Sequence, residues 1–562
     1  MSGNKKYHTN TVIPDTLVCI GYKSIYDDYD TVVIKDVIKD IPTQVILDFI
    51  VEQQNRVLYA FSDSATQKQQ IRDFCKYVST ETKERIWKFT KSQPKCMIYE
   101  TYGCALAYGY ALENYIPFEE EEDYFELCED EYEKVFKLIL YCNQNWTDKQ
   151  MPIDGNVNMI DLSLKIDLPI SEFKLYKDFR FQLSKAVTLF KFMEADKYYQ
   201  QILPYFYQDK KVVCWQEYIA RIFELYSVSL KGRYISANDN LGDASFYEQY
   251  CIDVENCVNL TQKHNALNYF RNKFLFDCGE RGYLLLNANL LVDKLYQGMR
   301  FDIWSTIKKH GITNKSGKKY NGWPDFNSNL GTDFSEPELL YALMRKTFTN
   351  HISAFFTGAE LHAKGIEGEP DLYMRIGSIL YLFEYKDVTL GDEYKYSEDI
   401  SVIKQAIKDR ICLNTGEKRK GAGQLYYNIN RIVNDGLMNT LDPEVKNITD
   451  IVPIIITTDR AFSAIGVEAL VVEEYSKWEI IYFKGFTAIP IVVDFDILID
   501  LSFRLHEGIL DIKDIVKSYL YQNAHNLTPF STFVLDKYKR KNNMISTEEN
   551  EYMFSDVISY LR

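Results

Sequence analysis

The sequence predicts an α+β multidomain protein, in which a mostly helical N-terminal region precedes a C-terminal α/β/α domain with a mixed sheet. The chain has 562 residues, 46% of them hydrophobic, and is therefore long enough to form more than one core. Up to about residue 300, apolar residues recur mainly at helical spacing. Beyond residue 334, helical segments alternate with short apolar runs, an order typical of layered α/β domains.

Composition excludes several classes of protein. The 43 Tyr and 33 Phe supply enough apolar surface to exclude general disorder. The apolar runs, such as 451–458, are shorter than the ~18 residues of a membrane span. The N-terminus has no apolar signal core, and the 11 cysteines include no C-x-x-C pair. We therefore expect a cytoplasmic protein with reduced thiols and no membrane contact.

A stretch rich in Gly, Asn, Ser and Lys, residues 309–333, is the clearest boundary in the chain. It divides the chain into a mainly helical recognition or regulatory region (1–308), a linker (309–334), an α/β domain (335–500) and C-terminal helices packed on that domain (501–562). Within the first region, the patterns predict helices over 129–146 and 215–230 and strands over 16–22 and 31–38.

The C-terminal half carries a distinct series of elements. Its patterns predict a helix over 336–349, a β-hairpin over 371–388, helices over 398–412 and 422–436, strands over 450–457 and 488–494, and helices over 508–522 and 548–561.

The hairpin carries the residues of greatest chemical interest. Gly377-Ser378 lies between two apolar runs, a signal for a two-residue turn. Pairing outward from this turn places Asp371 opposite Glu384, and Lys386 projects from the same sheet face. Adjacent carboxylates repel unless a hard cation lies between them, and Mg²⁺ prefers such oxygen ligands. An amine beside that cation can orient or deprotonate a water, which suits phosphodiester hydrolysis.

Pro370-Asp371, twelve intervening residues and Glu384-x-Lys386 resemble the motif of the PD-(D/E)xK nuclease superfamily, which has the restriction-endonuclease-like fold. The resemblance covers roughly residues 335–500. It implies a nuclease dependent on Mg²⁺ or Mn²⁺, in which Asp371 and Glu384 bind the metal, Tyr385 is a third ligand position and Lys386 assists the water. It also implies DNA as the expected substrate, with RNA as the alternative. The alternative is an ordinary Glu–Lys pair on an exposed hairpin edge.

The superfamily usually has a Glu on a helix before the hairpin, and this sequence offers two candidates. Ser335 and Glu338 form an S-x-x-E capping box, which gives Glu338 a structural role. Glu336 instead shares a helix face with Leu339 and Leu340, so we expect it to turn inward and to be the site residue.

Many members of the superfamily also have a Gln on a helix after the E-x-K strand. Gln424 opens such a helix here, with Asn428 and Arg431 along the same face. The usual Q-x-x-x-Y is not met, because Asn428 stands where the Tyr would be. Nearby basic residues are candidates for phosphate contacts, against the alternative of solvated side chains on exposed helices: Lys404, Lys408, Arg410, Lys418, Arg419 and Lys420.

The sequence thus predicts a metal-dependent endonuclease that acts on nucleic acid, with restriction or anti-phage defence as the role suggested by analogy. The alternative is a non-catalytic nucleic-acid-binding or assembly protein that keeps a nuclease-like scaffold. The net charge of −15 counts against a simple nucleic-acid coat protein. A protein or another regulatory ligand is expected for the N-terminal region, and homo-oligomerisation stays open.

Overall fold

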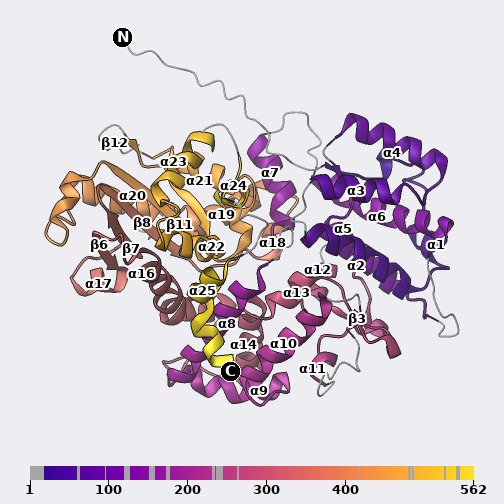
Figure 1. Cartoon of the computed structure of the whole chain (residues 1–562), viewed down its shortest axis with the longest axis horizontal. Helices are drawn as coiled ribbons and strands as arrows, with labels where there is room; N and C mark the ends of the chain where they lie inside the picture. Colours follow the sequence, from indigo (N-terminus) through magenta and orange to yellow (C-terminus); the bar gives the residue numbers. More distant parts are fainter. Residues whose placement is uncertain are drawn as a thin grey trace, which may run out of the picture. The chain divides into compact units, whose positions relative to one another are not determined.

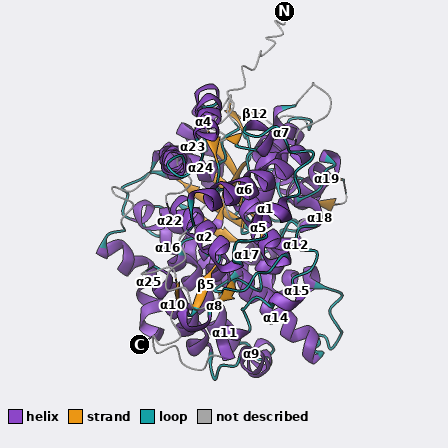
Figure 2. Ribbon diagram, turned by 90° about the vertical axis from the view of Figure 1, so that its right-hand side faces the viewer, coloured by secondary structure: helices purple, strands orange, loops and turns teal. Residues whose placement is uncertain are grey.

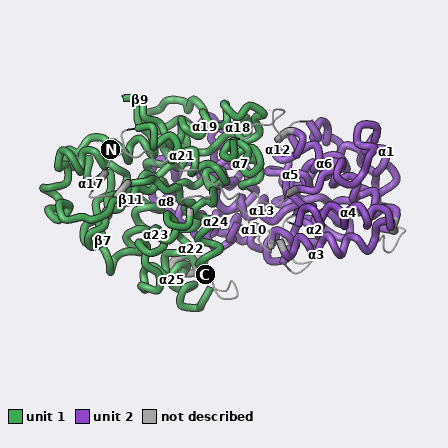
Figure 3. The backbone as a smooth tube through the Cα atoms, turned by 90° about the horizontal axis from the view of Figure 1, so that it is seen from above, with its two compact units in different colours: residues 1–14, 154–172, 313–562 green, residues 15–153, 173–312 purple. Residues whose placement is uncertain are grey.

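The computed structural model describes residues 18–561 except 60–63, 95, 119–126, 151–157, 173–176, 231–233, 236–244, 263–264, 417, 479–481, 484–485, 524–526 and 539–544. The chain forms two compact units (Figure 3): unit 1 takes in 154–172 and 313–562, and unit 2 takes in 15–153 and 173–312. This division differs from the sequence-based one, because 154–172 joins the C-terminal unit and part of the expected linker is helical. The structure is mostly helical (Figure 2). Among its described helices, none has the length and apolar character that crossing a bilayer requires.

Unit 2 is built mainly from helices. They are α1 (Ile34–Ile38), α2 (Thr43–Tyr59), α3 (Ser64–Phe74), α4 (Thr80–Ser92), α5 (Thr101–Glu113), α6 (Glu129–Gln150), α8 (Phe179–Ala195), α9 (Leu203–Lys210), α10 (Trp215–Ser229), α11 (Ser245–Glu248), α12 (Asn265–Phe270), α13 (Ala288–Asp293) and α14 (Gln297–His310). Its short strands are β1 (Val18–Cys19), β2 (Cys96–Met97), β3 (Tyr234–Ile235), β4 (Leu275–Asp277) and β5 (Tyr283–Leu285).

The strand expected over 31–38 is wrong, because its second half forms helix α1. Ile34 and Ile38 are both buried and lie four residues apart, which is the spacing of one helix face. The local run of β-branched residues hid this periodicity.

Unit 1 combines helices with a sheet. Its helices are α7 (Met159–Asp167), α15 (Trp323–Leu330), the π-helical segment η6 (Gly331–Tyr341), α16 (Ala342–Phe348), α17 (Gly358–Ala363), α18 (Asp392–Lys395), α19 (Ile400–Ile411), α20 (Ala422–Asn434), α21 (Val467–Tyr475), α22 (Phe495–His506), α23 (Ile512–Asn523), α24 (Phe530–Lys537) and α25 (Thr547–Leu561). Its strands are β6 (Ala354–Thr357), β7 (Leu372–Ile376), β8 (Ile379–Lys386), β9 (Asn414–Thr415), β10 (Lys418–Arg419), β11 (Asp450–Thr457), β12 (Tyr482–Phe483), β13 (Phe486–Thr487) and β14 (Ile491–Asp494).

Five of these strands form one mixed sheet in the order β14-β11-β8-β7-β6. Strands β8, β11 and β14 run parallel, whereas β6, β7 and β8 form an antiparallel meander. The expected α+β class with a mixed sheet in the C-terminal half is therefore confirmed.

The hairpin of β7 and β8 has the register expected from its turn. Ile376 pairs with Ile379, and the ladder continues to Leu372 opposite Phe383. The turn begins at Gly377, whose φ of +56° lies in the left-handed region that glycine adopts without a Cβ clash. Strand β8 is buried along nearly its whole length, because β7 and β11 flank it and helices cover its faces.

The helix before the hairpin is longer than expected. Helical structure runs without a break from Trp323 to Phe348, through α15, η6 and α16. The expected start at a Ser335–Glu338 capping box is therefore wrong. Pro337 lies inside the π segment. Proline is typical of the first turn of a helix, where no N–H is needed, so its position in the sequence resembles a helix start.

Helices cover both faces of the sheet (Figure 1). On one face, Leu380 and Leu382 of β8 join a core with α19, α20 and α21. On the other face, Tyr385 packs edge-on against Phe495 of α22, with ring centroids 5.9 Å apart. The alternation of side chains along β8 thus directs Glu384 and Lys386 toward the face that carries α20.

A buried ion pair fixes the hairpin to the chain that follows α20. The Arg375 guanidinium donates two hydrogen bonds to the Asp442 carboxylate, at 2.7 and 2.8 Å, and the Tyr373 hydroxyl donates a third at 2.8 Å. Burial by itself raises the pKa of Asp442, but the hydrogen bonds from Arg375 and Tyr373 outweigh it and hold that pKa below its usual value. The ionised carboxylate is therefore part of the folded state.

We expect Asp442→Ala to destabilise unit 1 by about 3–5 kcal/mol, because it leaves the buried Arg375 charge uncompensated. Urea unfolding should show a lower midpoint, and hydrogen exchange over 372–386 should accelerate. In the wild type the stabilisation is present above the ordinary Asp pKa and is lost as pH falls through the lowered one. The control is Glu444→Ala at a neighbouring exposed position, and equal midpoints for the two variants would contradict the assignment.

Candidate active site

The expected acidic pair is brought together at one end of the hairpin. Asp371 directly precedes β7, and extending the observed register by one step places it opposite Glu384. The backbone N–H of Tyr385 donates to Asp371 Oδ2 at 2.7 Å, and the charges of Asp371 and Glu384 act on each other. Two carboxyl groups placed so near each other cannot both ionise freely.

Lys386 and Gln424 complete this cluster. The Lys386 ammonium donates to Glu384 Oε1 and, at 3.3 Å, to Gln424 Oε1. Gln424 lies in the first turn of α20, which packs on the sheet face of Glu384. The four residues selected from the sequence therefore meet in space, although they come from two elements, β8 and α20, and from the residue preceding β7.

Burial controls the protonation of the cluster. It raises the pKa of Glu384 well above its usual value, and the charge of Asp371 raises it further. The pKa of Asp371 is also raised by loss of water contacts, against the opposing effect of Lys386. Burial lowers the pKa of Lys386, but the neighbouring carboxylates outweigh it and leave that pKa raised. Two carboxyl groups, both with raised pKa values, thus lie beside a single ammonium group.

A divalent cation would compensate the negative charge of this pair of carboxyl groups. Glu384 Oε2 is fully buried and has no hydrogen-bond partner among the described residues, which is costly for a carboxylate oxygen unless a cation reaches it. In the described part of the chain, no three His, Cys, Asp or Glu side chains form a metal-binding group by themselves. Asp371 and Glu384 would therefore need other oxygen ligands.

The main chain of Tyr385 can supply one such ligand, but its side chain cannot. The Tyr385 ring packs on the opposite sheet face, against Phe495. Its N–H points toward Asp371, and in an antiparallel pair the N–H and C=O of one residue face the same neighbouring strand. The Tyr385 carbonyl therefore lies on the Asp371 side of β8. This is the side on which a third metal ligand at position 385 would have to lie.

Glu336 enters the site from η6, whereas Glu338 on the same segment is exposed. Loss of water contacts raises the pKa of Glu336 to about 7, and the charge of Asp371 contributes to this rise. Lys386 and a hydrogen bond from Tyr341 act in the opposite direction. The choice of Glu336 over Glu338 agrees with these positions, although the capping-box argument behind it is wrong.

Asp387 is a positioning residue that the sequence reasoning missed. Its carboxylate accepts hydrogen bonds from the Ser335 hydroxyl at 2.6 Å and the Thr458 hydroxyl at 2.7 Å. Its carbonyl accepts from the Asn327 side chain at 2.5 Å. Asp387 thereby ties the helix of Glu336 to the ends of β8 and β11. Its place directly after E-x-K was the available signal.

The six basic candidates have different environments. Lys404 pairs with Asp161 at 2.9 Å and Lys408 pairs with Glu474 at 2.6 Å, so intramolecular carboxylates neutralise both. Arg410 donates to the carbonyls of Thr389 and Ala406. The remaining three lie beside or within the β9–β10 hairpin and include two exposed ammonium groups: Lys418, Arg419 and Lys420.

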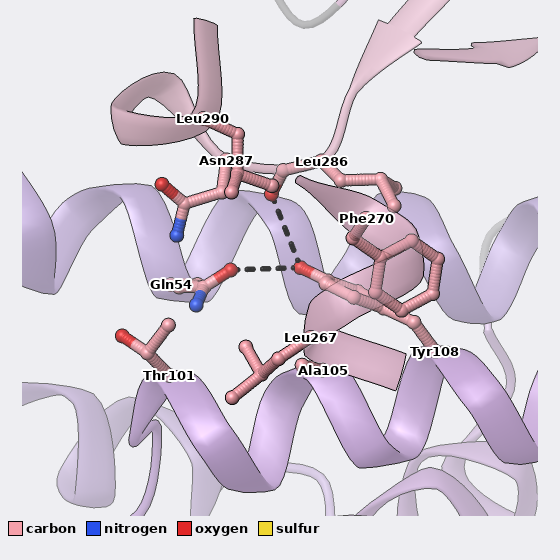
Figure 4. A pocket seen from close by; sticks show the side chains of 9 residues that line it. All are labelled: Gln54, Thr101, Ala105, Tyr108, Leu267, Phe270, Leu286, Asn287 and Leu290. Carbon is pink, nitrogen blue, oxygen red and sulfur yellow. Dashed lines mark hydrogen bonds between the residues drawn. The ribbon is translucent and has the colours of Figure 1, made fainter. Parts of the chain in front are cut away.

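Unit 2 contains a small cavity (Figure 4), lined by Gln54, Thr101, Ala105, Tyr108, Leu267, Phe270, Leu286, Asn287 and Leu290. The Tyr108 hydroxyl donates to Gln54 Oε1 at 2.9 Å, and the Asn287 amide nitrogen is buried without a partner in the described structure. The described lining includes no charged side chain. This cavity therefore offers no reactive group comparable to those at the end of β8.

Comparison with protein-family models gives no match for this chain, and comparisons with curated proteins and with solved structures give none either.

The raised pKa of Glu336 predicts a pH-dependent effect of Glu336→Gln. A carboxyl whose folded-state pKa is about 7 favours folding below its ordinary value of about 4.3, and this contribution is lost as pH rises through 7. In metal-free buffer, we therefore expect the variant and the wild type to melt together at pH 5 and the variant to melt higher at pH 8. Glu338→Gln is the exposed control. A difference in Tm that does not change with pH would contradict this prediction.

Proposed function

We propose that unit 1 is a nuclease dependent on Mg²⁺ or Mn²⁺ that hydrolyses phosphodiester bonds, with DNA as the preferred substrate. The observation that carries this proposal is Glu384 Oε2, which is buried beside Asp371 and Lys386 and has no hydrogen-bond partner among the described residues. A bound divalent ion would supply charge neutralisation at the phosphate and a more acidic water. The resemblance of Pro370-Asp371 and Glu384-x-Lys386 to the PD-(D/E)xK motif, together with the mixed sheet covered by helices on both faces, supports the same function.

In the proposed reaction, different residues bind the metal ion and activate the water. Asp371, Glu384 and the Tyr385 carbonyl would hold the ion. Lys386 Nζ, oriented by Gln424 Oε1, would hold the attacking water through a hydrogen bond and accept its proton. The carboxylates raise the pKa of Lys386 in the free protein. Neutralising them lowers that pKa toward the range in which an amine accepts a proton.

Glu336 adds a third carboxyl at the edge of the same site. Its pKa of about 7 means that protonated and ionised forms coexist near neutral pH. A carboxyl in this state can exchange a proton with a nearby water or phosphate oxygen, which suits general acid–base catalysis. Its anchorage through Ser335 and Asp387 keeps it near the strand ends during turnover.

A cytoplasmic location and a role in restriction or anti-phage defence would be consistent with such an enzyme, with unit 2 as the part that binds a regulatory ligand or partner. This biological role is proposed by analogy with the superfamily that the motif resembles.

The proposal predicts that Lys386→Ala loses at least about a hundredfold in cleavage rate, as expected for removal of a general base. Supercoiled plasmid, single-stranded DNA and RNA are each incubated with and without Mg²⁺ or Mn²⁺. Lys446→Ala is the matched control, because Glu444-x-Lys446 repeats the sequence pattern at an exposed site outside the hairpin. Cleavage by Lys386→Ala at the wild-type rate would contradict the role of this lysine.

The same samples distinguish an enzyme from a scaffold that binds no metal. A cation that binds only the folded state raises Tm, by the equivalent of about 2.7 kcal/mol at a hundred times its Kd. The wild type should therefore show a rise in Tm with Mn²⁺ that Glu384→Ala lacks. A wild type that neither cleaves nor responds to Mn²⁺ would favour the non-catalytic alternative.

A further inference from the structure

Two arginines lie over one tyrosine ring beside the candidate site. The Arg419 guanidinium is 4.1 Å and the Arg431 guanidinium 5.1 Å from the ring centroid of Tyr427. Contacts of this kind hold a cation against the negative face of an aromatic ring. Together the three side chains, all partly buried, form an arginine–tyrosine cluster made by β10 and α20.

The cluster is joined to the catalytic end of the hairpin through the loop that precedes Asp371. Arg431 Nη1 donates to the carbonyl of Glu367 at 2.6 Å. The Tyr427 ring packs so closely on Gly368, whose φ is +65°, that a Cβ there would lie 3.3 Å from it. Both contacts fall within the four residues before Asp371. The position of the cluster is therefore coupled to the position of the acidic pair.

Helix α20 connects the same cluster with the other side of the site. Gln424 accepts the hydrogen bond from Lys386, and Arg431 is seven residues further along, on nearly the same face. Seven residues of α-helix span about 10 Å. This distance corresponds to roughly three nucleotide steps of a duplex strand, each of which rises about 3.4 Å along the helix axis. A strand cut at the site could thus place a neighbouring phosphate at Arg431.

The charges of the cluster are not neutralised within the described structure. Lys404 and Lys408 have carboxylate partners, whereas neither Arg419 nor Arg431 forms an ion pair with a described carboxylate. Two guanidinium groups on one ring repel each other, and an anion between or beside them relieves that repulsion. The planar donor fork of arginine matches the geometry of a phosphate.

We propose that Arg419, Tyr427 and Arg431 form a surface that binds the phosphodiester backbone of nucleic acid next to the candidate active site. This inference rests on the proposed nuclease function and specifies how its substrate is held. Tyr427 supports the two cations, and its ring is therefore engaged with guanidinium groups instead of with bases. The surface binds phosphate groups and has no preference for base sequence.

The test measures binding and its salt dependence in EDTA, where no cleavage interferes. Fluorescence anisotropy with labelled single-stranded DNA, duplex DNA and single-stranded RNA compares the wild type with Arg419→Ala/Arg431→Ala. We expect binding to weaken by roughly tenfold or more, as charged hydrogen bonds are lost. The slope of log K against log salt should fall by about 0.7–0.9 for each phosphate contact removed. The three nucleic acids show which polymer carries the backbone that is bound.

Tyrosine variants separate backbone contact from base stacking. Tyr427→Phe keeps the ring and should bind like the wild type, whereas Tyr427→Leu should lose part of the affinity and part of the salt slope. Lys517→Ala, an exposed site on α23, is the control for loss of one charge. Unchanged affinity and slope in the double arginine variant, at unchanged Tm, would overturn the inference. A loss limited to one base sequence with an unchanged slope would also overturn it.

A small substrate separates this inference from the proposed function. Bis(p-nitrophenyl) phosphate carries a single phosphodiester group and no neighbouring phosphate for Arg431 to bind. Its Mn²⁺-dependent hydrolysis should therefore persist in the double arginine variant and disappear in Lys386→Ala. Hydrolysis by the wild type with normal nucleic-acid binding by the arginine variants would refute the binding surface alone. An arginine-dependent binding loss without any hydrolysis by the wild type would refute the nuclease and retain the surface.

Discussion

The antiparallel pairing of β7 with β8 is the constraint on which the candidate site depends. It places Asp371 opposite Glu384 at a strand end that α20 and the neighbouring strands remove from water. Two carboxyl groups in such a place cannot both ionise freely, and Lys386 compensates only one of them. The site therefore favours taking up positive charge, either as protons or as a divalent cation.

Parts of the chain outside the hairpin hold this arrangement in place. Asp387 joins η6 to the ends of β8 and β11, while Asp442 joins Arg375 to the segment after α20. A π-helical segment with an internal proline is less regular than an α-helix, and such segments are frequent at functional sites. Here its irregular geometry directs Glu336 to the acidic pair and Ser335 to Asp387. The hydrogen bonds that hold these segments together thus also position the residues of the candidate site.

Much of unit 1 was predictable because its signals are local. The turn at Gly377-Ser378 fixed the hairpin register, and the alternation along β8 fixed which side chains share a face. The helices and strands after the hairpin also lie close to their expected positions. The start of the preceding helix was mispredicted because Ser335, Pro337 and Glu338 imitate a helix N-terminus. The first helix of unit 2 was missed because β-branched residues concealed a four-residue spacing.

The sequence by itself determined the mixed α+β architecture of the C-terminal half and the pairing of Asp371 with Glu384, because strand period and turn chemistry act over a few residues. Only the tertiary structure decided which charges remain available. In the fold, Lys404 and Lys408 pair with carboxylates distant in the chain. Arg419 and Arg431 lie over one tyrosine ring. Glu384 Oε2 is buried without a partner in the described structure. Ion pairing and burial depend on residues far apart in the chain, and no local pattern encodes them.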